Sequence, residues 1–235
     1  MRKHIFFVLL CFLLAGSALG QKAKPWTDWS KKDADKMVND SSWAQSITRG
    51  EAPPAMSGNA NEGRMGGAAA PSSNAPQTEY SFRVRLISAK PIREGFARRL
   101  VLAQPERAND LTPQLQGIID KGFGDYIIVG VNVDGKDSRS YAPYLAMLSR
   151  LSTAALADKV YLERKDGKRL PLAEYKSPIA DDMGGKFIFP RTLDGAPFLG
   201  PDSDSVRFVL AVSDKMKLDV KFKVSAMMYG DKLEY

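Results

Sequence analysis

Apolar and polar residues alternate along two stretches of the chain, YSFRVRL (80–86) and KLDVKFKVSA (217–226). Successive side chains of a strand point to opposite faces, so each stretch predicts a strand with one buried face and one wet face. The expected buried positions are Tyr80, Phe82, Val84 and Leu86 in the first strand and Leu218, Val220, Phe222, Val224 and Ala226 in the second.

Between these strands the pattern changes to a helical one. SAKPIREGFARRLVL (88–102) has Pro91 near its start, where a proline fits the first turn of a helix. The apolar stripe of this helix is expected at Ile92, Phe96 and Leu100. Further along the chain, another helix is expected over much of 141–155.

The stretch LTPQLQGIIDKGFG (111–124) has the residues that begin and end helices. Thr112 can cap, Pro113 can start the first turn and Gly122 can stop the helix. The sequence therefore predicts a helix that begins at this threonine.

The second half of the chain is rich in strand patterns. KVYLERKDGKRLPLAEY (159–175) predicts a hairpin around Asp166-Gly167, because this dipeptide readily takes positive φ angles. Further strands are expected at GKFIF (185–189) and SVRFVLAV (205–212), and the continuously apolar DYIIVGVNV (125–133) is typical of a central strand. Because the strands cluster late, we expect an α+β fold: a mostly antiparallel, sandwich-like β domain with two or three helices.

The start of the chain has the order of a secretory signal peptide. Arg2 and Lys3 precede an apolar run over 5–15, and small residues lie ahead of Gln21. We therefore expect cleavage near Gly20-Gln21, which removes residues 1–20 and leaves a chain that is secreted or periplasmic. No later stretch is long and apolar enough to predict a transmembrane segment.

Composition divides the remainder into three parts. Residues 51–78 consist mostly of Ala, Gly, Pro, Ser and Asn, and predict a disordered linker. The α+β domain is expected over 79–235, and a tryptophan-containing helical segment over 21–50.

The tryptophan segment contains all three tryptophans, Trp26, Trp29 and Trp43. Ser30 and Asp33 resemble a capping box that starts a short helix. Because so short a helix is marginal alone, the tryptophans are expected to anchor it, either on its own domain, which we favour, or on a partner.

Removal of the leader also removes particular chemistries. The single histidine, His4, and the single cysteine, Cys11, both lie within residues 1–20. The mature chain therefore has no imidazole or thiol for a histidine-based triad, a cysteine nucleophile, a zinc site or a disulfide. No cofactor and no metal are expected.

Charge points only weakly to a partner. The formal charge of the whole chain is +7, which biases it towards anionic surfaces without indicating specific nucleic-acid binding. Basic residues are concentrated in 83–99, where the alternatives are a binding face for an anionic envelope component and a surface complementary to the acidic stretch 181–204. Candidate binding residues are Arg83, Arg85, Arg93, Arg98 and Arg99, together with Trp26, Trp29 and Trp43.

Acidic residues give few catalytic candidates. No catalytic residue is assigned, and the least weak candidates are Asp181, Asp182 and Glu163, which would have to converge in a cleft. NVDGKD (132–137) offers oxygen atoms for calcium but lacks the EF-hand pattern, so a plain turn at Asp134-Gly135 is the preferred interpretation.

Three segments carry a resemblance to a known group. Trp29, Ala34 and DSSWAQS (40–46), with SAKPIREGFARRL (88–100) and KFIFPR (186–191), resemble a family of exported bacterial proteins that have an N-terminal tryptophan helix and an SPWA-like motif. The resemblance implies no activity. The sequence thus favours a secreted or periplasmic, non-catalytic binding or structural module of the envelope, with a protein or an anionic envelope component as partner. The alternative is a carboxylate-dependent hydrolase that acts on an envelope or extracellular polymer.

Overall fold

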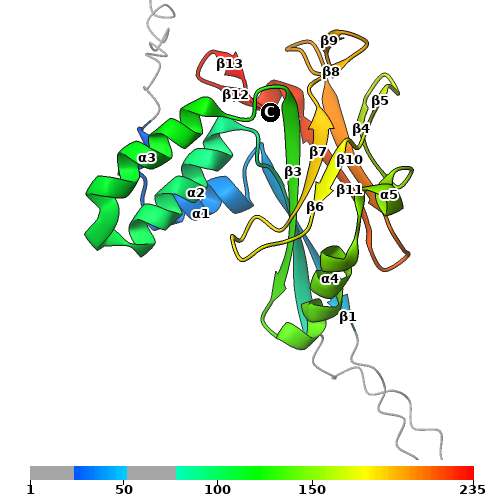
Figure 1. The fold of residues 1–235 in the computed structure, drawn as a ribbon, viewed down its shortest axis with the longest axis horizontal. Helices are drawn as coiled ribbons and strands as arrows, with labels where there is room; N and C mark the ends of the chain where they lie inside the picture. Colours follow the sequence, from blue (N-terminus) through cyan, green and yellow to red (C-terminus); the bar gives the residue numbers. More distant parts are fainter. Residues whose placement is uncertain (1–23, 52–77) are drawn as a thin grey trace, which may run out of the picture.

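The computed structural model describes residues 24–51 and 78–235. The expected signal peptide and nearly all of the expected linker lie outside these residues. The described chain is an α+β protein in which two antiparallel sheets pack together and three helices form a layer beside them (Figure 1). The predicted fold class is confirmed.

The larger sheet has five strands in the order β1-β2-β3-β7-β6. Their bounds are β1 (Ala44–Glu51), β2 (Thr78–Leu86), β3 (Tyr126–Gly135), β7 (Gly185–Pro190) and β6 (Glu174–Lys176). Every neighbouring pair is antiparallel. β3 lies in the middle of the sheet and is buried on both faces over most of its length, as its apolar sequence predicts.

The smaller sheet has four strands in the order β11-β10-β4-β5. Their bounds are β4 (Val160–Arg164), β5 (Arg169–Pro171), β10 (Ser205–Ala211) and β11 (Lys217–Lys223). The expected hairpin joins β4 to β5, but only Gly167 takes a positive φ, +83°, and Asp166 does not. The Asp166 carboxylate instead pairs with Arg164, which fixes the turn from its side chain.

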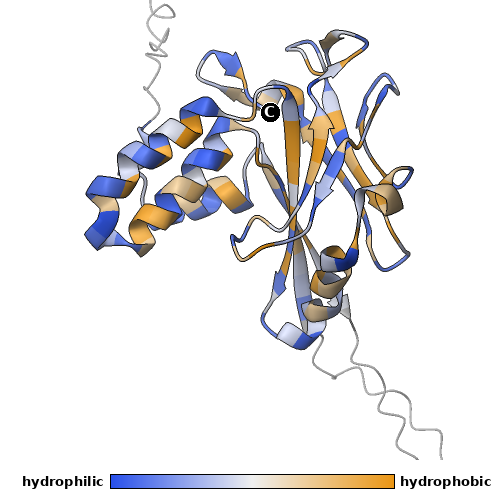
Figure 2. Cartoon of the chain, viewed as in Figure 1, coloured by the Kyte–Doolittle hydropathy of each residue, from blue (hydrophilic) through white to orange (hydrophobic). Residues whose placement is uncertain are grey.

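The main core lies between the two sheets. The predicted alternate positions of β2, and those of the β11 stretch up to Val224, point into it, and Phe187 of β7 meets Phe208 of β10 with ring centroids 5.3 Å apart. The prediction is wrong for Ala226, which is exposed because β11 ends at Lys223 and the chain turns into a 3-10 turn over Val224–Ala226. Figure 2 shows these apolar positions along the strands. Helix α4 (Ser138–Arg150) covers one end of the core, where Tyr144 stacks on Tyr80, and α5 (Thr153–Leu156) follows it.

The remaining elements are short. Two small hairpins are formed by β8 (Thr192–Leu193) with β9 (Ala196–Pro197) and by β12 (Met228–Tyr229) with β13 (Lys232–Leu233). Single 3-10 turns lie at η1 (Trp26–Asp28), η2 (Pro105–Arg107) and η3 (Val224–Ala226).

The helical layer consists of α1 (Lys31–Asn39), α2 (Lys90–Ala103) and α3 (Ala108–Lys121). The capping box of α1 is present: the Ser30 hydroxyl accepts from the Asp33 backbone N–H, and the Asp33 carboxylate accepts from the Ser30 N–H. α1 and α2 pack closely because Gly95 has no side chain; a Cβ there would lie 2.6 Å from Val38 Cγ1.

This close packing changes the expected stripe of α2. Ile92 is buried, but Leu100 is 39% exposed, and the helix instead buries Gly95, Ala97 and Val101. Small residues face α1 because they let the two helices approach each other, which a periodicity argument based on large apolar residues does not detect.

Two predicted boundaries are wrong. α3 begins at Ala108, so Pro113 lies inside the helix and the Thr112 hydroxyl donates to the Ala108 carbonyl instead of capping the start. The turn placed at Asp134-Gly135 is also wrong, because β3 continues to Gly135, which pairs with Tyr80.

The tryptophans are buried on the protein's own domain. Trp43 lies in the main core, and its indole N–H donates to the Glu234 carbonyl at 2.7 Å. Trp26 and Trp29 pack in a second cluster with α2 and α3, and their indole N–H groups donate to Gln116 and to the Lys24 carbonyl. All three are 5 to 7% exposed.

The segment 24–51 therefore forms part of the folded domain. Its last residues form β1, and Glu51 pairs directly with Thr78 of β2. Residues 52–77 thus connect two strands that are already neighbours in one sheet.

β1 also connects the two sheets. The Arg49 guanidinium donates to the Lys215 carbonyl at 3.0 Å and to the Lys217 carbonyl, and the Gln45 amide donates to the Lys221 carbonyl. These side chains bond to backbone groups of β11, the edge strand of the smaller sheet, and of the turn that leads into it.

One carboxyl group is buried under the helical layer. Glu94 of α2 accepts a hydrogen bond from the Tyr229 hydroxyl, with Lys90 at 4.0 Å. Burial raises the pKa of the Glu94 carboxyl above its ordinary value, although the bond from Tyr229 and the charge of Lys90 act against the shift.

This shift predicts the effect of Glu94→Gln on the pH dependence of stability. A carboxyl whose pKa is raised in the folded protein loses stabilisation as pH rises from its ordinary pKa through its folded-state pKa. The free energy of unfolding of the variant, relative to the wild type, should therefore increase with pH and level off above the folded-state value. Urea unfolding from about pH 4 to about pH 8 measures it.

The matched control is Glu106→Gln, at an exposed position of η2. The difference in free energy of unfolding between this variant and the wild type should stay nearly constant over the same pH range, because an exposed carboxyl is solvated in both the folded and the unfolded state. If the difference in free energy of unfolding between Glu94→Gln and the wild type were also independent of pH, burial of Glu94 would not be raising the pKa of its carboxyl.

Candidate functional site

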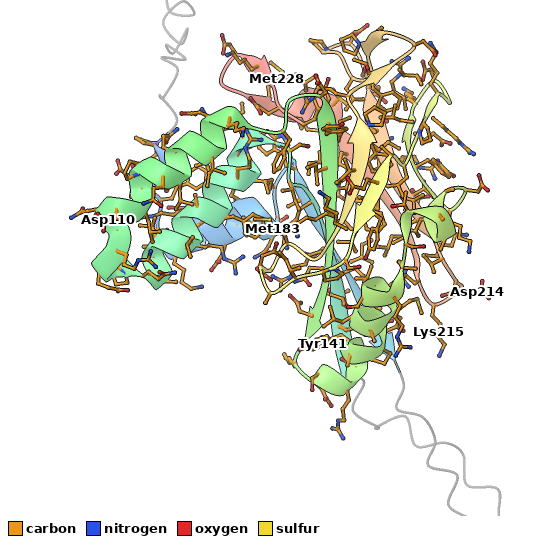
Figure 3. The ribbon with its side chains drawn as sticks, in the orientation of Figure 1. Asp110, Tyr141, Met183, Asp214, Lys215 and Met228 are labelled. Atoms are coloured by element: carbon orange, nitrogen blue, oxygen red, sulfur yellow. The ribbon has the colours of Figure 1, made fainter. Side chains whose placement is uncertain are left out.

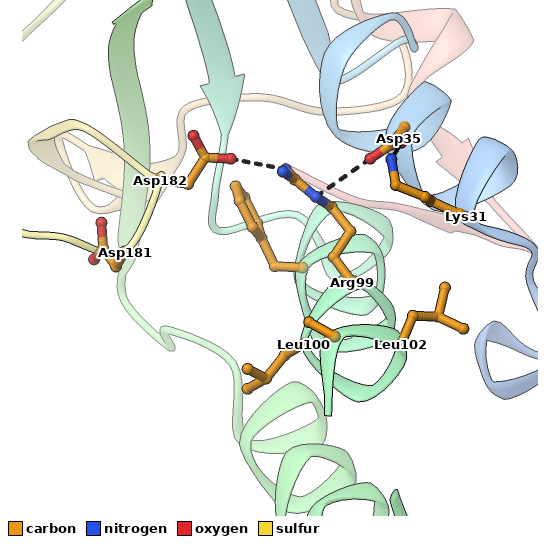
Figure 4. Close-up of a pocket in the computed structure, with 9 residues that line it drawn as sticks. Lys31, Asp35, Arg99, Leu100, Leu102, Asp181 and Asp182 are labelled. Atoms are coloured by element: carbon orange, nitrogen blue, oxygen red, sulfur yellow. Dashed lines mark hydrogen bonds and ion pairs between the residues drawn. The ribbon is translucent and has the colours of Figure 1, made fainter. Parts of the chain in front are cut away.

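A shallow groove lies where α2, α1 and the loop between β6 and β7 meet. Its volume is about 380 Å³, and Figure 4 shows it. The floor is apolar and the rim is charged; the lining residues are Lys31, Asp35, Phe96, Arg99, Leu100, Leu102, Ala103, Asp181 and Asp182. The groove thus contains two of the three candidate acids and one of the candidate arginines.

Asp182 is held by three elements. Its carboxylate accepts from Arg99 of α2 at 2.8 Å and from the Asn132 amide of β3 at 3.0 Å, and its carbonyl accepts from Arg85 of β2 at 2.7 Å. Its φ is +60°, a left-handed conformation that is uncommon for a residue with a side chain. The arrangement makes Asp182 a link between α2 and the sheet.

Gly184 explains how the loop can approach the sheet so closely. It has φ +76°, and a Cβ there would overlap the Val131 carbonyl of β3. Only glycine fits this position, so the Asp181-Asp182 pair is pinned against the outer face of the larger sheet.

Asp181 points away from its neighbour and forms a separate ion pair. Its carboxylate lies 2.7 Å from Lys186 Nζ and also accepts from the Met183 backbone N–H. Figure 4 shows the two carboxylates directed to different sides of the loop. The two acids therefore do not form a convergent pair.

Glu163 lies on the smaller sheet. Its carboxylate accepts from Arg207 of β10 at 2.9 Å and from Arg169 of β5 at 2.6 Å. β4, the strand that carries Glu163, does not line the groove. The structure thus brings Asp181 and Asp182 to one loop and does not bring Glu163 to them.

Arg85, one of the candidate binding residues, is completely buried. Its guanidinium donates to the Val38 carbonyl at 2.7 Å, to Asn39 Oδ1 at 2.9 Å and to the Asp182 carbonyl, and it lies over the Phe96 ring. Burial lowers the pKa of Arg85 to about 10. An exposed fraction of 0% leaves no atom of this residue for a ligand.

The other candidate arginines also have internal partners. Arg83 pairs with Asp134 at 3.0 Å and donates to Asn39, and Arg98 donates to the Trp29 carbonyl at 2.6 Å. Arg93 donates to the Ile119 and Ser88 carbonyls. Arg99 bridges Asp182 and Asp35, with Nε 3.3 Å from the latter carboxylate.

The basic run 83–99 therefore joins the helical layer to the larger sheet. Of the eight candidate binding residues, the three tryptophans and Arg85 are buried, and each of the other four arginines donates to partners within the fold. This geometry argues against a free binding face. Within the described residues, Asp182 is the one acid of the stretch 181–204 that the arginines of the run contact, and their other partners lie outside that stretch.

The calcium-like stretch does not form a site either. Asn132 donates to Asp182, Asp134 pairs with Arg83, and Asp137 caps α4 and pairs with Arg139. Across residues 24–51 and 78–235, no group of three or more acidic, histidine or cysteine side chains is arranged to hold a metal. In the same part of the chain, no helix has the length and apolar character needed to cross a membrane.

Sequence reasoning did not select the lysines of β11. Lys217, Lys221 and Lys223 are exposed and point away from the core. Their signal was present as polar positions that alternate with apolar ones, but alternation alone is typical of any half-buried strand.

No family model, no curated protein and no solved structure matches the chain. The function is therefore argued from its own residues.

Proposed function

We propose that this protein is an exported, non-catalytic module that binds a component of the cell envelope. The absence of catalysis is supported by the ion pairs and the positions of the three candidate acids. Asp181, Asp182 and Glu163 are each held by a cation at 2.6 to 2.9 Å; the two aspartates lie in the loop before β7, and Glu163 lies on β4 of the smaller sheet. A catalytic carboxyl pair needs two groups that converge on one substrate.

The carboxylates have another role in this fold. Asp182 holds α2 to the larger sheet through Arg99, and Glu163 joins three strands of the smaller sheet through its two arginines. Export rests on the leader sequence ahead of Gln21, which lies outside the described residues. No observation separately favours the hydrolase alternative.

Co-sedimentation with washed bacterial envelopes tests this function. The mature chain (21–235) should sediment with envelopes in a saturable manner, and a triple variant, Asp181→Asn, Asp182→Asn and Glu163→Gln, should bind to the same extent. The variant's melting temperature is measured first, because these acids also stabilise the fold.

Two results would overturn the proposal. One is failure of the mature chain to sediment with envelopes at any concentration. The other is release of soluble envelope fragments by the wild-type protein and not by a folded triple variant, which would establish the hydrolase instead.

A further inference from the structure

The outer face of the smaller sheet carries a row of lysines. The inward positions of β11, Leu218, Val220 and Phe222, are buried in the core, so Lys217, Lys221 and Lys223 stand on the opposite face. The strand register places Lys221 opposite Arg207 and Lys223 opposite Ser205. We call this set of three residues the lysine row.

Two more cations lie near the ends of the lysine row, and each already has a partner. The Arg49 guanidinium donates to the Lys217 carbonyl and lies over the Phe82 ring, and the Lys165 ammonium pairs with Asp204. Figure 3 shows that Lys215 projects from the turn that leads into β11. On the outward face of β11, three lysines therefore stand against one aspartate, Asp219.

The acids on this face are already neutralised by other residues. Arg207 pairs with Asp219 and with Glu163, Arg169 pairs with Glu163, and Lys165 pairs with Asp204 at 3.1 Å. Among the residues that the structure describes, the lysine row forms no ion pair. Arg207, Arg169 and Lys165 therefore balance these carboxylates, and the three lysines of the lysine row form no ion pair with them.

The pKa of the Asp204 carboxyl is affected by the positive charge of this face. Its pKa lies below its ordinary value, mainly because of the hydrogen bond from Lys165, and the charges of Lys221 and Lys223 lower it further. The lysine row thus stabilises an anion that is already present beside it.

The face has little to offer an apolar ligand. Val209, its central apolar residue, is only 8% exposed, and the Arg169 guanidinium lies 4.2 Å from the centroid of the Tyr161 ring. The exposed large apolar side chains of the described residues belong to other elements, among them Leu100, Leu102 and Ile118 of the helical layer. A face that inserts into a bilayer would need such side chains.

Lysines spaced along a strand suit a ligand with repeated charges. Alternate residues of a strand are about 6.5 to 7 Å apart, which is the spacing of Lys221 and Lys223, and each lysine is a flexible point charge with three donors. Lys217 lies two such steps from Lys221, and the position between them is held by Asp219, whose charge is paired with Arg207. We propose that the lysine row binds an extended, acidic linear polymer, whose phosphate or carboxylate groups lie along β11. This inference rests on the proposed envelope-binding function and names its ligand class and its surface.

The test uses fluorescently labelled linear polyphosphate and the full mature chain. Anisotropy should show binding that weakens as salt increases, and the variant Lys217→Gln, Lys221→Gln, Lys223→Gln should bind between about tenfold and 100-fold more weakly at low salt. The slope of log affinity against log salt should fall by about 2, because each phosphate that a lysine no longer neutralises reduces it by about 0.7.

The matched control removes the same charge elsewhere. Lys32, Lys121 and Lys136 are exposed on α1, α3 and the turn after β3, and their replacement by glutamine should change the affinity by about twofold or less. Equal losses of affinity in both triple variants would overturn the inference, because the effect would then follow net charge and not the lysine row.

Two further measurements separate the sources of failure. Binding to phosphatidylglycerol vesicles without binding to polyphosphate would overturn the inference in favour of a membrane surface. If the lysine variant sediments with envelopes as the wild type does, the surface is wrong and the envelope function stands. If the wild type does not sediment at all, the proposed function itself fails.

Discussion

Residues 78–235 should be largely unfolded without the segment 24–51. That segment supplies one strand of the larger sheet and three buried indoles. Truncation of a buried tryptophan costs about 3 to 5 kcal/mol, and a typical domain is stable by about 5 to 15 kcal/mol. The loss of the whole segment is therefore comparable to the total stability. Circular dichroism and binding of an apolar dye to residues 78–235 measure the effect.

Addition of the missing segment as a peptide should restore the fold. Because Glu51 already pairs with Thr78, the covalent connection through 52–77 is not needed to place β1 beside β2. All three tryptophans belong to the peptide, so association should shift their fluorescence to shorter wavelength and saturate at one peptide per domain.

A peptide with Trp43→Ala is the control. Trp43 lies in the main core and contacts Tyr229 edge to face, so its removal should weaken association by at least about 100-fold. Emission typical of exposed indoles in the full mature chain, together with a truncated domain that melts at the same temperature, would show instead that the tryptophans serve a partner.

Arg85→Leu should lower the free energy of unfolding by about 3 to 5 kcal/mol. The substitution removes a buried cation and leaves the Val38 carbonyl and the Asp182 carbonyl without their donor, whereas the Asn39 amide oxygen keeps the hydrogen bond from Arg83. An unsatisfied buried acceptor costs about 1 to 3 kcal/mol, so the two carbonyls account for most of the decrease. Urea unfolding measures it.

Arg83→Gln provides the comparison on the same strand. Arg83 makes a half-exposed ion pair with Asp134, and removal of such a pair costs about 1 kcal/mol or less. Similar decreases in stability at the two positions would mean that the bonds of Arg85 to the end of α1 and to the loop contribute little.

Local signals in the sequence predicted the local structure well. The Ser30 and Asp33 pair predicted the start of α1, and the alternating residues of β2 and of the β11 stretch up to Val224 predicted which side chains reach the core. The alternation failed only at Ala226, beyond the end of the strand. Each signal depends only on residues a few positions apart, so no knowledge of the fold is needed to interpret it.

The same alternation misled the interpretation of Arg85. It correctly placed this residue on the face of β2 opposite the core, but that face is covered by the end of α1, which lies more than forty residues earlier in the chain. Whether the outward face of a strand is exposed to solvent depends on which elements pack over it. The sequence of β2 alone contains no information about α1.

The candidate acids show a similar limit. The sequence shows that the aspartates at 181 and 182 are adjacent, but their ion pairs with Lys186 and Arg99 depend on a loop and a helix whose relative position is set by the tertiary fold. The separation of Glu163 from this loop follows from its place in the second sheet.

The hydrogen bonds from Gln45 and Arg49 to β11 also affect how readily the strand edges can pair with another chain. A free strand edge is a template for another chain, and edges that are exposed during folding promote aggregation. Here the two long edge strands, β1 and β11, face each other and are bridged by side chains, while the other edges, β5 and β6, are only three residues long. The Lys217 and Lys221 carbonyls on the edge of β11 are thus already occupied by side chains of β1, which leaves fewer free backbone groups on this edge to pair with a second copy.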